Sequence, residues 1–380
     1  MSKKIKLMVV IGTRPEAIKL APVILAARAQ PDNFEVCVVR TSQHKEMLDQ
    51  VMAVFGLEAD IDLNIMQPNQ DLVHITTASL RGLYDAMAQI KPDWVVVQGD
   101  TTTTFAGALA AFYHRIPVAH VEAGLRTGER YLPFPEEINR CLTTRLSDWH
   151  FAPTTASRDN LLREGIPAEQ IVVTGNTAID ALFLTLARAG KPVANEGAQT
   201  SSATANKLLI TAHRRENQGA PMAEICGAVL DLLERYSTLE AVFPVHLSPA
   251  VRATVMPMLG NHPRVALVEP LDYPAFVLAM HDARLILTDS GGVQEEAPSL
   301  GKPVLVLRDS TERPEAVQAG TAILVGAVRQ TIVQAASELL DNPAAYDAMA
   351  RAINPFGDGH ASERILATLL NCGAAHNVGN

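Results

Sequence analysis

The sequence is poor in the residue types on which several large classes of protein depend. Aromatic residues make up 5% of the 380 residues, and the formal net charge is −9. Proteins that bind nucleic acid without regard to its sequence rely on clustered Lys and Arg, often beside stacking aromatic rings. No apolar run approaches the roughly 18 residues that a membrane span requires. We therefore expect neither a nucleic-acid partner nor a membrane.

Cysteine is also scarce. The four cysteines are far apart in the chain: Cys37, Cys141, Cys226 and Cys372. Without a Cys-x-x-Cys or His-x-x-x-His spacing, neither a disulfide framework nor a metal site is indicated. The apolar run Ile5–Ile11 is soon interrupted by Arg14 and Glu16, and no small-residue cleavage site follows. We interpret that run as a strand rather than a signal peptide, and expect a cytoplasmic protein with free thiols.

The glycine-rich signatures of common nucleotide cofactor sites are missing as well. No Gly-x-Gly-x-x-Gly follows a predicted strand, and there is no Gly-x-x-x-x-Gly-Lys-Ser/Thr. The two Gly-Lys pairs, at Gly190 and Gly301, are each followed by proline, which favours a turn over a phosphate loop. We therefore expect no cofactor.

What the chain does contain is a regular alternation of short apolar runs and longer helical periodicities. Its 380 residues, 48% of them hydrophobic, are too many for one typical domain. We predict strands at Ile5–Ile11, Glu35–Arg40, Trp94–Gln98, Val118–Val121 and Ile171–Thr174, and then at Lys207–Thr211, Leu239–Val245, Val265–Val268, Arg284–Thr288, Pro303–Leu307 and Thr321–Val325.

This alternation predicts two α/β domains, each with a doubly wound, mostly parallel sheet covered by helices on both faces. We assign residues 1–190 to the first domain and 207–354 to the second. Residues 191–206 are rich in small polar residues and are predicted to form a linker. Residues 355–380 are predicted to contain a last helix near Ala361–Leu370 and a tail, and we expect this helix to pack back on the first domain. Because such sheets bind ligands at the carboxyl ends of their strands, we expect the site in a cleft between the domains.

A possible anion site follows one strand of the second domain. In the stretch from Leu287 to Arg313, a strand leads into Ser290-Gly291-Gly292 and then a short helix with Glu296. Adjacent glycines permit close approach of the backbone to a ligand, and a helix start offers unpaired N–H groups to phosphate. Glu296 would suit the hydroxyls of a ribose. The alternative is an ordinary strand-to-helix turn with solvated glutamates.

Three basic groups also follow predicted strands. Arg14 and Lys19 lie near a helix start after the first strand, and His213 directly follows the first strand of the second domain. Arginine and lysine at such a position suit a diphosphate, and a histidine can bind phosphate or protonate a departing one. The alternatives are a surface turn with solvated cations and a loop histidine with no special role.

Three carboxylates, Asp100, Glu122 and Glu136, lie in loops that we place at the same end of the first sheet. Clustered acids can divide acid and base roles between them. Taken singly, each has a simpler explanation, since Asp100 could cap the Thr-rich helix that follows and Glu136 could be a favourable charge in a first helical turn. All three at strand ends favour chemistry.

Taken in order, these segments resemble one enzyme family. The segments are Gly12–Lys19, Gly99–Thr104, His120–Arg126, Pro135–Arg140, Thr174–Thr177, His213–Asn217, Ser290–Glu296 and Thr311–Glu315. They resemble the non-hydrolysing UDP-N-acetylglucosamine 2-epimerases, over the chain from Ile5 to about Leu370. The resemblance implies a glycosyltransferase-B arrangement of two Rossmann-like domains and a homodimer. It also implies interconversion of UDP-N-acetylglucosamine and UDP-N-acetylmannosamine without NAD or metal.

The resemblance also assigns roles to residues. Positions that bind UDP are matched by Arg14, His213, Phe276, Ser290, Gly291, Gly292, Glu296 and Arg313. Positions tied to the chemistry are matched by Lys19, Asp100, Glu122, Glu136 and Arg140, and we also assign His213 to this group. Some members bind substrate at a second, activating site, part of which Gln43, His44 and Gln70 match. Asn69 stands where such members often carry arginine.

The implied reaction explains why carboxylates and cations are both needed. The hydrogen on C2 of an acetamido sugar is not next to a carbonyl, so direct deprotonation is too slow. If the bond from C1 to UDP breaks first, one carboxylate can remove the C2 proton and a second can return a proton to the opposite face. The alternatives are an epimerase that releases free N-acetylmannosamine, a glycosyltransferase, and a nucleotide-sugar sensor without catalysis.

Overall fold

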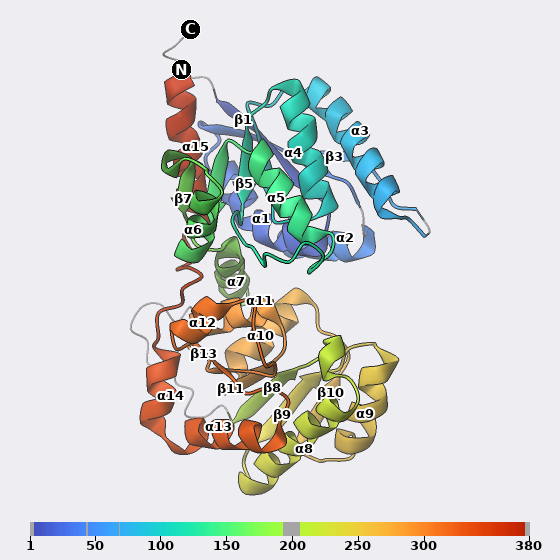
Figure 1. Ribbon diagram of the computed structural model, residues 1–380, viewed down its shortest axis with the longest axis vertical. Helices are drawn as coiled ribbons and strands as arrows, with labels where there is room; N and C mark the ends of the chain where they lie inside the picture. Colours follow the sequence, from blue (N-terminus) through green and yellow to red (C-terminus); the bar gives the residue numbers. More distant parts are fainter. Residues whose placement is uncertain (1–3, 43–44, 68, 193–205, 377–380) are drawn as a thin grey trace. The chain divides into compact units, whose positions relative to one another are not determined.

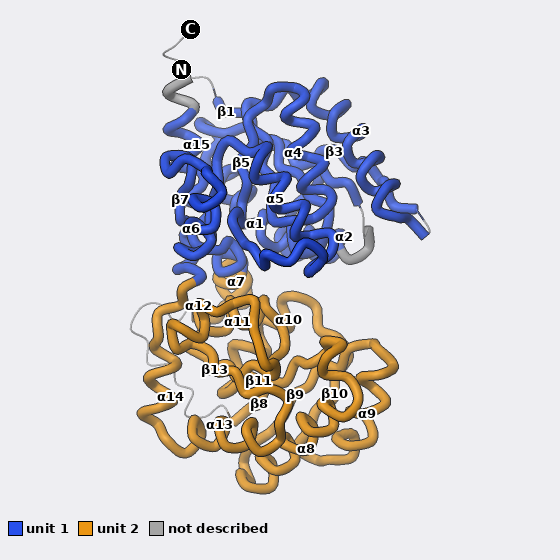
Figure 2. The backbone as a smooth tube through the Cα atoms, in the orientation of Figure 1, with its two compact units in different colours: residues 1–181, 356–380 blue, residues 182–355 orange. Residues whose placement is uncertain are grey.

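Two parallel sheets, each in its own compact unit, organise the chain. The computed structural model describes residues 4–42, 45–67, 69–192 and 206–376. Unit 1 comprises residues 1–181 together with 356–380, and unit 2 comprises residues 182–355 (Figures 1 and 2). Helix α7 (Thr177–Arg188) begins in unit 1 and ends in unit 2.

The sheet of unit 1 has seven parallel strands in the order β3-β2-β1-β4-β5-β6-β7. Its strands are β1 Ile5–Ile11, β2 Phe34–Arg40, β3 Ile61–Asp62, β4 Trp94–Gln98, β5 Val118–Val121, β6 Trp149–Ala152 and β7 Ile171–Val173. The central strands β4 and β5 are buried along their whole length, as expected for strands covered on both faces.

Helices cover both faces of this sheet because the strand order reverses direction between β1 and β4. The helices are α1 Arg14–Arg28, α2 Lys45–Val54, α3 Leu72–Ile90, α4 Thr102–His114, α5 Glu136–Leu146, α6 Thr155–Arg163 and α15 Ala361–His376, with a 3₁₀ turn at Ala168–Gln170. Helix α1 packs against α2 and α15, whereas α4 packs against α3 and α5.

The sheet of unit 2 has six parallel strands in the order β10-β9-β8-β11-β12-β13. They are β8 Lys207–Thr211, β9 Glu240–Pro244, β10 Val265–Val268, β11 Leu285–Thr288, β12 Val304–Val306 and β13 Ala322–Leu324. The helices are α8 Ala220–Arg235, α9 Pro249–Leu259, α10 Tyr273–Asp282, α11 Gly291–Glu296, α12 Pro314–Gln318, α13 Arg329–Asp341 and α14 Pro343–Ala350, with 3₁₀ turns at Arg215–Asn217 and Ala297–Leu300. The apolar core lies mainly between the sheet and α8, α9 and α13.

In each unit the strand order reverses between two central strands, and that point is where doubly wound sheets bind ligands. In unit 1 the reversal lies between β1 and β4, which lead into the Gly12 and Gly99 loops. In unit 2 it lies between β8 and β11, which lead into His213 and Ser290. The topology therefore places the predicted loops of each unit at its own switch point.

The sequence prediction missed two strands, β3 and β6. Strand β3 has only two residues, and β6 reads Trp-His-Phe-Ala, in which a buried histidine interrupts the apolar pattern. The predicted linker at 191–206 falls almost wholly outside the described residues. Within the described residues, no helix is long and apolar enough to cross a membrane.

The C-terminal segment is fastened to unit 1 by polar contacts. The backbone N–H of Asn176 donates to the carbonyl of Phe356 (2.6 Å), and Asp180 accepts from the N–H of Ser362 (2.8 Å). Gly175, with φ +87°, lies so close to Gly357 that a Cβ on either glycine would approach the backbone of the other within about 3 Å. Glycine at both positions is therefore required for this close approach.

Two neutral histidines lie side by side in the sheet of unit 1. His120 and His150 are paired in register on β5 and β6, and both are fully buried. Burial lowers the pKa of His120 to about 4 and that of His150 to about 3. Each imidazole takes up a proton near pH 6.5 in the unfolded chain but only at a lower pH in the folded protein. Their contribution to stability is therefore complete above pH 6.5 and is lost as the pH falls toward 4.

We expect the free energy of unfolding to fall by about 2 kcal/mol for each buried histidine between pH 7 and pH 5. Trp94 and Trp149 both lie in unit 1, so urea denaturation followed by tryptophan fluorescence reports on this unit. His150→Leu should lose about half of that pH dependence, because it removes one of the two buried imidazoles. An equally steep decline in wild type and His150→Leu would contradict this account.

Candidate functional site

A buried carboxylate fastens together the two loops at the switch point of unit 1. Glu16, on α1, accepts hydrogen bonds from the N–H groups of Gly12 (3.0 Å) and Thr13 (2.6 Å). It also accepts from the hydroxyls of Thr101 (2.8 Å) and Thr104 (3.0 Å) in the other loop. Burial raises the pKa of Glu16, and the hydrogen bonds from Thr13, Thr101 and Thr104 oppose that shift. Glu16 thus fixes the position of Arg14, the first residue of α1.

Glu122 lies at the centre of a second network in unit 1. Its backbone has φ +64°, a left-handed conformation that a non-glycine residue seldom adopts. Lys19 donates to both carboxylate oxygens, at 2.6 and 2.7 Å, and Asn176 donates to one of them at 3.2 Å. Gln98 donates to the other oxygen. The sequence suggested Lys19 for a diphosphate, but here its ammonium group pairs with a predicted catalytic acid.

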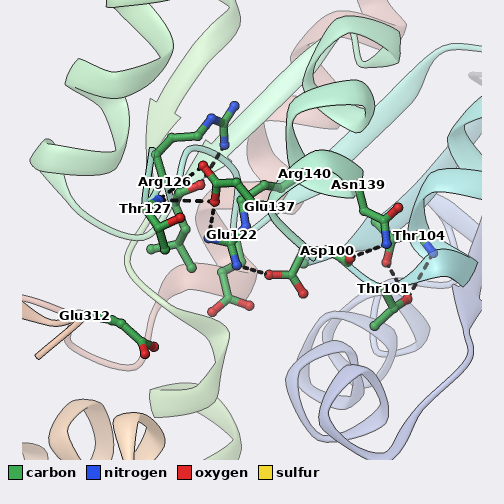
Figure 3. A network of polar contacts seen from close by, with 12 residues as sticks. Asp100, Thr101, Thr104, Glu122, Arg126, Thr127, Glu137, Asn139, Arg140 and Glu312 are labelled. Carbon is green, nitrogen blue, oxygen red and sulfur yellow. Dashed lines mark hydrogen bonds and ion pairs between the residues drawn. The ribbon is translucent and has the colours of Figure 1, made fainter. Parts of the chain in front are cut away.

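Asp100 and Arg140 form a third cluster, drawn in Figure 3. Arg140 bonds to Asp100 through one nitrogen and to Glu137 (3.1 Å) through another. The amide of Asn139 donates to the Asp100 carbonyl (3.0 Å). Helix α4 is capped by the hydroxyl of Thr101 and not by Asp100, so the simpler explanation of Asp100 as a helix cap is wrong. The Asp100 side chain is paired instead with Arg140 on α5.

Glu136 is the first residue of α5 and directly precedes Glu137. Its Oε2 is buried and has no hydrogen-bond partner among the residues that the structure describes. A buried carboxylate oxygen without a donor is costly, because its solvation by water is lost. Glu136 thus lies in the first turn of α5, where a negative charge is favourable. Its Oε2 remains available to accept a hydrogen bond from a ligand.

Behind these loops, neutral His120 supports the segment that carries Asp100. Its Nε2 lies 2.8 Å from the carbonyl oxygen of Gly99, so Nε2 carries the proton and donates it. Gly99 has φ +73°, and a Cβ built there would lie 3.8 Å from a Glu122 carboxylate oxygen. The Gly99 turn thereby brings the Asp100 and Glu122 loops close together.

In unit 2, the Ser290-Gly291-Gly292 turn begins α11, a helix of only six residues. A helix this short has a small dipole, so backbone N–H groups and cations must supply most of the attraction for an anion. The guanidinium of Arg313 lies 3.8 Å from where a Cβ of Gly291 would be, and buried Glu295 bonds to its Nε. Glu295, which the sequence left without a role, therefore holds Arg313 beside the glycine turn.

The remaining predicted UDP positions also lie in unit 2. His213 follows β8, the neighbour of the strand that leads into Ser290. Glu296 is the last residue of α11, and Phe276 is half-buried on α10. Each side chain is thus on an element at or next to the switch point of unit 2.

Of the predicted activating site, only Gln70 is described. It precedes α3, and its side-chain oxygen accepts from the N–H of Gln67 (3.3 Å). Gln43 and His44 lie outside the described residues. Among the described residues, no cluster of three or more His, Cys, Asp or Glu side chains could hold a metal ion.

Sequence reasoning missed the residues that position the predicted ones. They are Glu16, Gln98, Glu137, Asn139, Asn176, Asp289 and Glu295. Most stand inside the segments already singled out, next to the residues that were chosen. A rule that every buried charge needs a partner would have directed attention to them.

Comparison with known proteins identifies the family. Residues 8–370 match the family model described as UDP-N-acetylglucosamine 2-epimerase. The chain is 52% identical to the UDP-N-acetylglucosamine 2-epimerase of Escherichia coli K12 over 375 residues, which cover 96% of this chain and 98% of that protein.

Solved structures agree with this match. The UDP-GlcNAc 2-epimerase of Neisseria meningitidis, crystallised with UDP-GlcNAc, is 51% identical with a TM-score of 0.84, covering 97% of this chain and all (100%) of that one. The enzyme of Methanocaldococcus jannaschii is 36% identical with a TM-score of 0.82, covering 97% and 100%. The predicted fold class, two Rossmann-like domains of glycosyltransferase-B type, is thereby confirmed. The chain belongs to the UDP-N-acetylglucosamine 2-epimerase family.

Proposed function

We propose that the protein is a non-hydrolysing isomerase that interconverts UDP-N-acetylglucosamine and UDP-N-acetylmannosamine. The observation that carries the proposal is the set of three acids that follow β4, follow β5 and begin α5 in unit 1. Glu122 and Asp100 are each held by a cation, and Glu136 presents a buried oxygen without a donor among the described residues. Family membership supports the substrate, since the Neisseria meningitidis enzyme was crystallised with UDP-GlcNAc.

The reaction proceeds by elimination and re-addition. The C1–O bond breaks, and UDP departs with the bonding electron pair. One carboxylate then takes the C2 proton, and a C1–C2 double bond forms to give 2-acetamidoglucal. A second acidic side chain, protonated at this stage, returns its proton to the other face of C2 and becomes a carboxylate, and the diphosphate oxygen of UDP bonds to C1 again. Because the glycal and UDP stay bound in the same site, their recombination is effectively unimolecular. This favours re-addition over loss of the intermediate.

The roles divide between the two units. Asp100, Glu122 and Glu136 act on the sugar. Arg140 holds Asp100 in place, and Lys19 holds Glu122. In unit 2, His213, Arg313 and the Ser290–Gly292 turn bind the diphosphate, Glu296 the ribose and Phe276 the uracil. Arg14 of unit 1 adds a further cation for the diphosphate.

NMR of the sugar tests this proposal. Incubation with UDP-N-acetylglucosamine alone should give UDP-N-acetylmannosamine, and protein treated with chelator and charcoal should keep its turnover. The alternative is a hydrolysing epimerase, which would release N-acetylmannosamine and UDP instead. If neither UDP-N-acetylmannosamine nor N-acetylmannosamine forms, or if activity returns only when NAD is added, the proposed reaction is refuted.

Glu296→Ala should weaken UDP binding by about 1–3 kcal/mol, because it removes the hydrogen-bond acceptors that we assign to the ribose hydroxyls. Titration calorimetry with UDP measures this directly. Glu234→Ala is the matched control, since Glu234 is exposed at the C-terminal end of α8, at the opposite edge of the sheet. Equal affinity in wild type and Glu296→Ala would remove Glu296 from the ribose site.

We further propose a cytoplasmic homodimer. The cytoplasm suits the four cysteines, none of which forms a disulfide within the chain. The dimer rests on the family resemblance, and sedimentation tests it. A second, activating substrate site at Gln43, His44 and Gln70 would give sigmoidal dependence of rate on UDP-N-acetylglucosamine.

A further inference from the structure

A buried aspartate stands behind His213 in unit 2. Asp289 directly follows β11 and is completely buried. One of its carboxylate oxygens, Oδ2, accepts three hydrogen bonds: from the N–H groups of His213 (2.8 Å) and Arg214 (2.8 Å) and from the side chain of Asn217 (2.9 Å). These bonds fix the carboxylate and the loop after β8 relative to each other.

The other oxygen of the same carboxylate is left for the imidazole. Oδ1 is buried and has no hydrogen bond among the described residues, and Nδ1 of His213 lies 3.4 Å from it. A small rotation of the ring would bring Nδ1 to hydrogen-bonding distance. Since a carboxylate can only accept, its presence here favours the tautomer with the proton on Nδ1.

A second histidine limits how the ring can turn. The rings of His213 and His246 are stacked, with centroids 5.4 Å apart and an angle of 16° between their planes. Nδ1 of His246 accepts from the N–H of Ser248 (3.0 Å), so the neutral His246 ring carries its proton on Nε2. Stacking on His246 restrains the orientation of the His213 ring plane. The carboxylate of Asp289 favours the ring position in which Nδ1 faces it.

We propose that Asp289 is a positioning residue that fixes His213 as the Nδ1–H tautomer and leaves Nε2 free for the diphosphate. When Nε2 takes up a proton, the resulting imidazolium donates to the diphosphate through Nε2 and to Asp289 through Nδ1. The buried carboxylate then stabilises this cation while UDP carries its extra charge after leaving C1. The role of His213 in binding the diphosphate rests on the proposed function, whereas the assignment of its Nδ1–H tautomer does not.

Asp289→Asn is the sharpest variant. The asparagine oxygen can replace Oδ2 and keep the three donors, but its NH₂ group then faces Nδ1 and can only donate. His213 must switch to the Nε2–H tautomer. ¹⁵N NMR of protein labelled at histidine, assigned with His213→Asn, should show the proton on Nδ1 in wild type and on Nε2 in Asp289→Asn.

Asn217→Ala is the matched control, because it removes one donor to the same carboxylate without changing what faces Nδ1. It should keep the wild-type tautomer. Adding UDP to wild type should shift the resonance of Nε2 more than that of Nδ1. In the epimerase assay, Asp289→Asn should lower kcat by about 10²-fold or more, as expected when a histidine is held in the wrong tautomer, and Asn217→Ala should lower it less than tenfold.

A wild-type His213 with its proton on Nε2, or the same tautomer in wild type and Asp289→Asn, would overturn the proposal. The wild-type spectrum alone decides if Asp289→Asn does not fold. If the tautomer switches as expected but no variant and no wild-type sample epimerises UDP-N-acetylglucosamine, the proposed function fails and the assignment of Asp289 stands.

Discussion

Replacing Asp100, Glu122 or Glu136 one at a time with the corresponding amide is expected to lower the turnover number by roughly 10²-fold or more. An amide has nearly the shape of the carboxylate but cannot take a proton from C2 or return one. UDP binding should stay nearly intact, because the proposed contacts to UDP are mainly in unit 2. Steady-state kinetics and calorimetry with UDP separate the two effects.

Glu169→Gln is a matched control, since Glu169 is exposed in the 3₁₀ turn before β7, at the opposite edge of the same sheet. Its turnover should equal that of wild type. Wild-type reaction in heavy water should place deuterium at C2 of the product, because the proton returned to the other face comes from a second acid that has exchanged with the solvent. If all three amide variants turned over at near the wild-type rate, or C2 kept its original hydrogen, elimination would have to be abandoned.

The two sheets were predictable from the sequence because their strands are short, apolar and separated by helical periods. Trp94–Gln98 was predicted with its observed bounds, and Ile5–Ile11 likewise. A sheet covered on both faces buries such runs completely, so local composition carries the information. Prediction failed at β6, where burial of His150 depends on a tertiary environment that no local pattern records.

The candidate site was only partly predictable, for a related reason. The acids could be located because they follow strands, and the carboxyl ends of parallel strands gather at one edge. Their partners could not, since Lys19 is 103 positions from Glu122 and Asn176 is 54. The left-handed backbone of Glu122 is likewise fixed by its surroundings and contradicts the local preference of glutamate.

The pairing of Lys19 with Glu122 predicts a large effect on stability as well as on rate. The two side chains are 21% and 4% exposed, so little water compensates when one partner is lost. Lys19→Met should lower the free energy of unfolding by about 3 kcal/mol, because it leaves a buried carboxylate without its cation. Gln98 and Asn176 still donate to Glu122, which keeps the loss near the lower end of the range for broken buried pairs.

The double variant separates charge from packing. Lys19→Met combined with Glu122→Gln should be more stable than Lys19→Met alone by about 2 kcal/mol, since no unpaired charge remains, yet it should stay as inactive as Glu122→Gln. Arg81→Met removes the cation of an exposed ion pair with Asp85 on α3 and should change stability by less than about 0.5 kcal/mol. Urea denaturation followed by the fluorescence of Trp94 and Trp149 measures all five proteins in the same unit: wild type, Lys19→Met, Glu122→Gln, the double variant and Arg81→Met. Additive effects of the two substitutions would mean that the Lys19 cation does not stabilise the charge of Glu122, and the diphosphate role that the sequence first suggested for Lys19 would then be favoured.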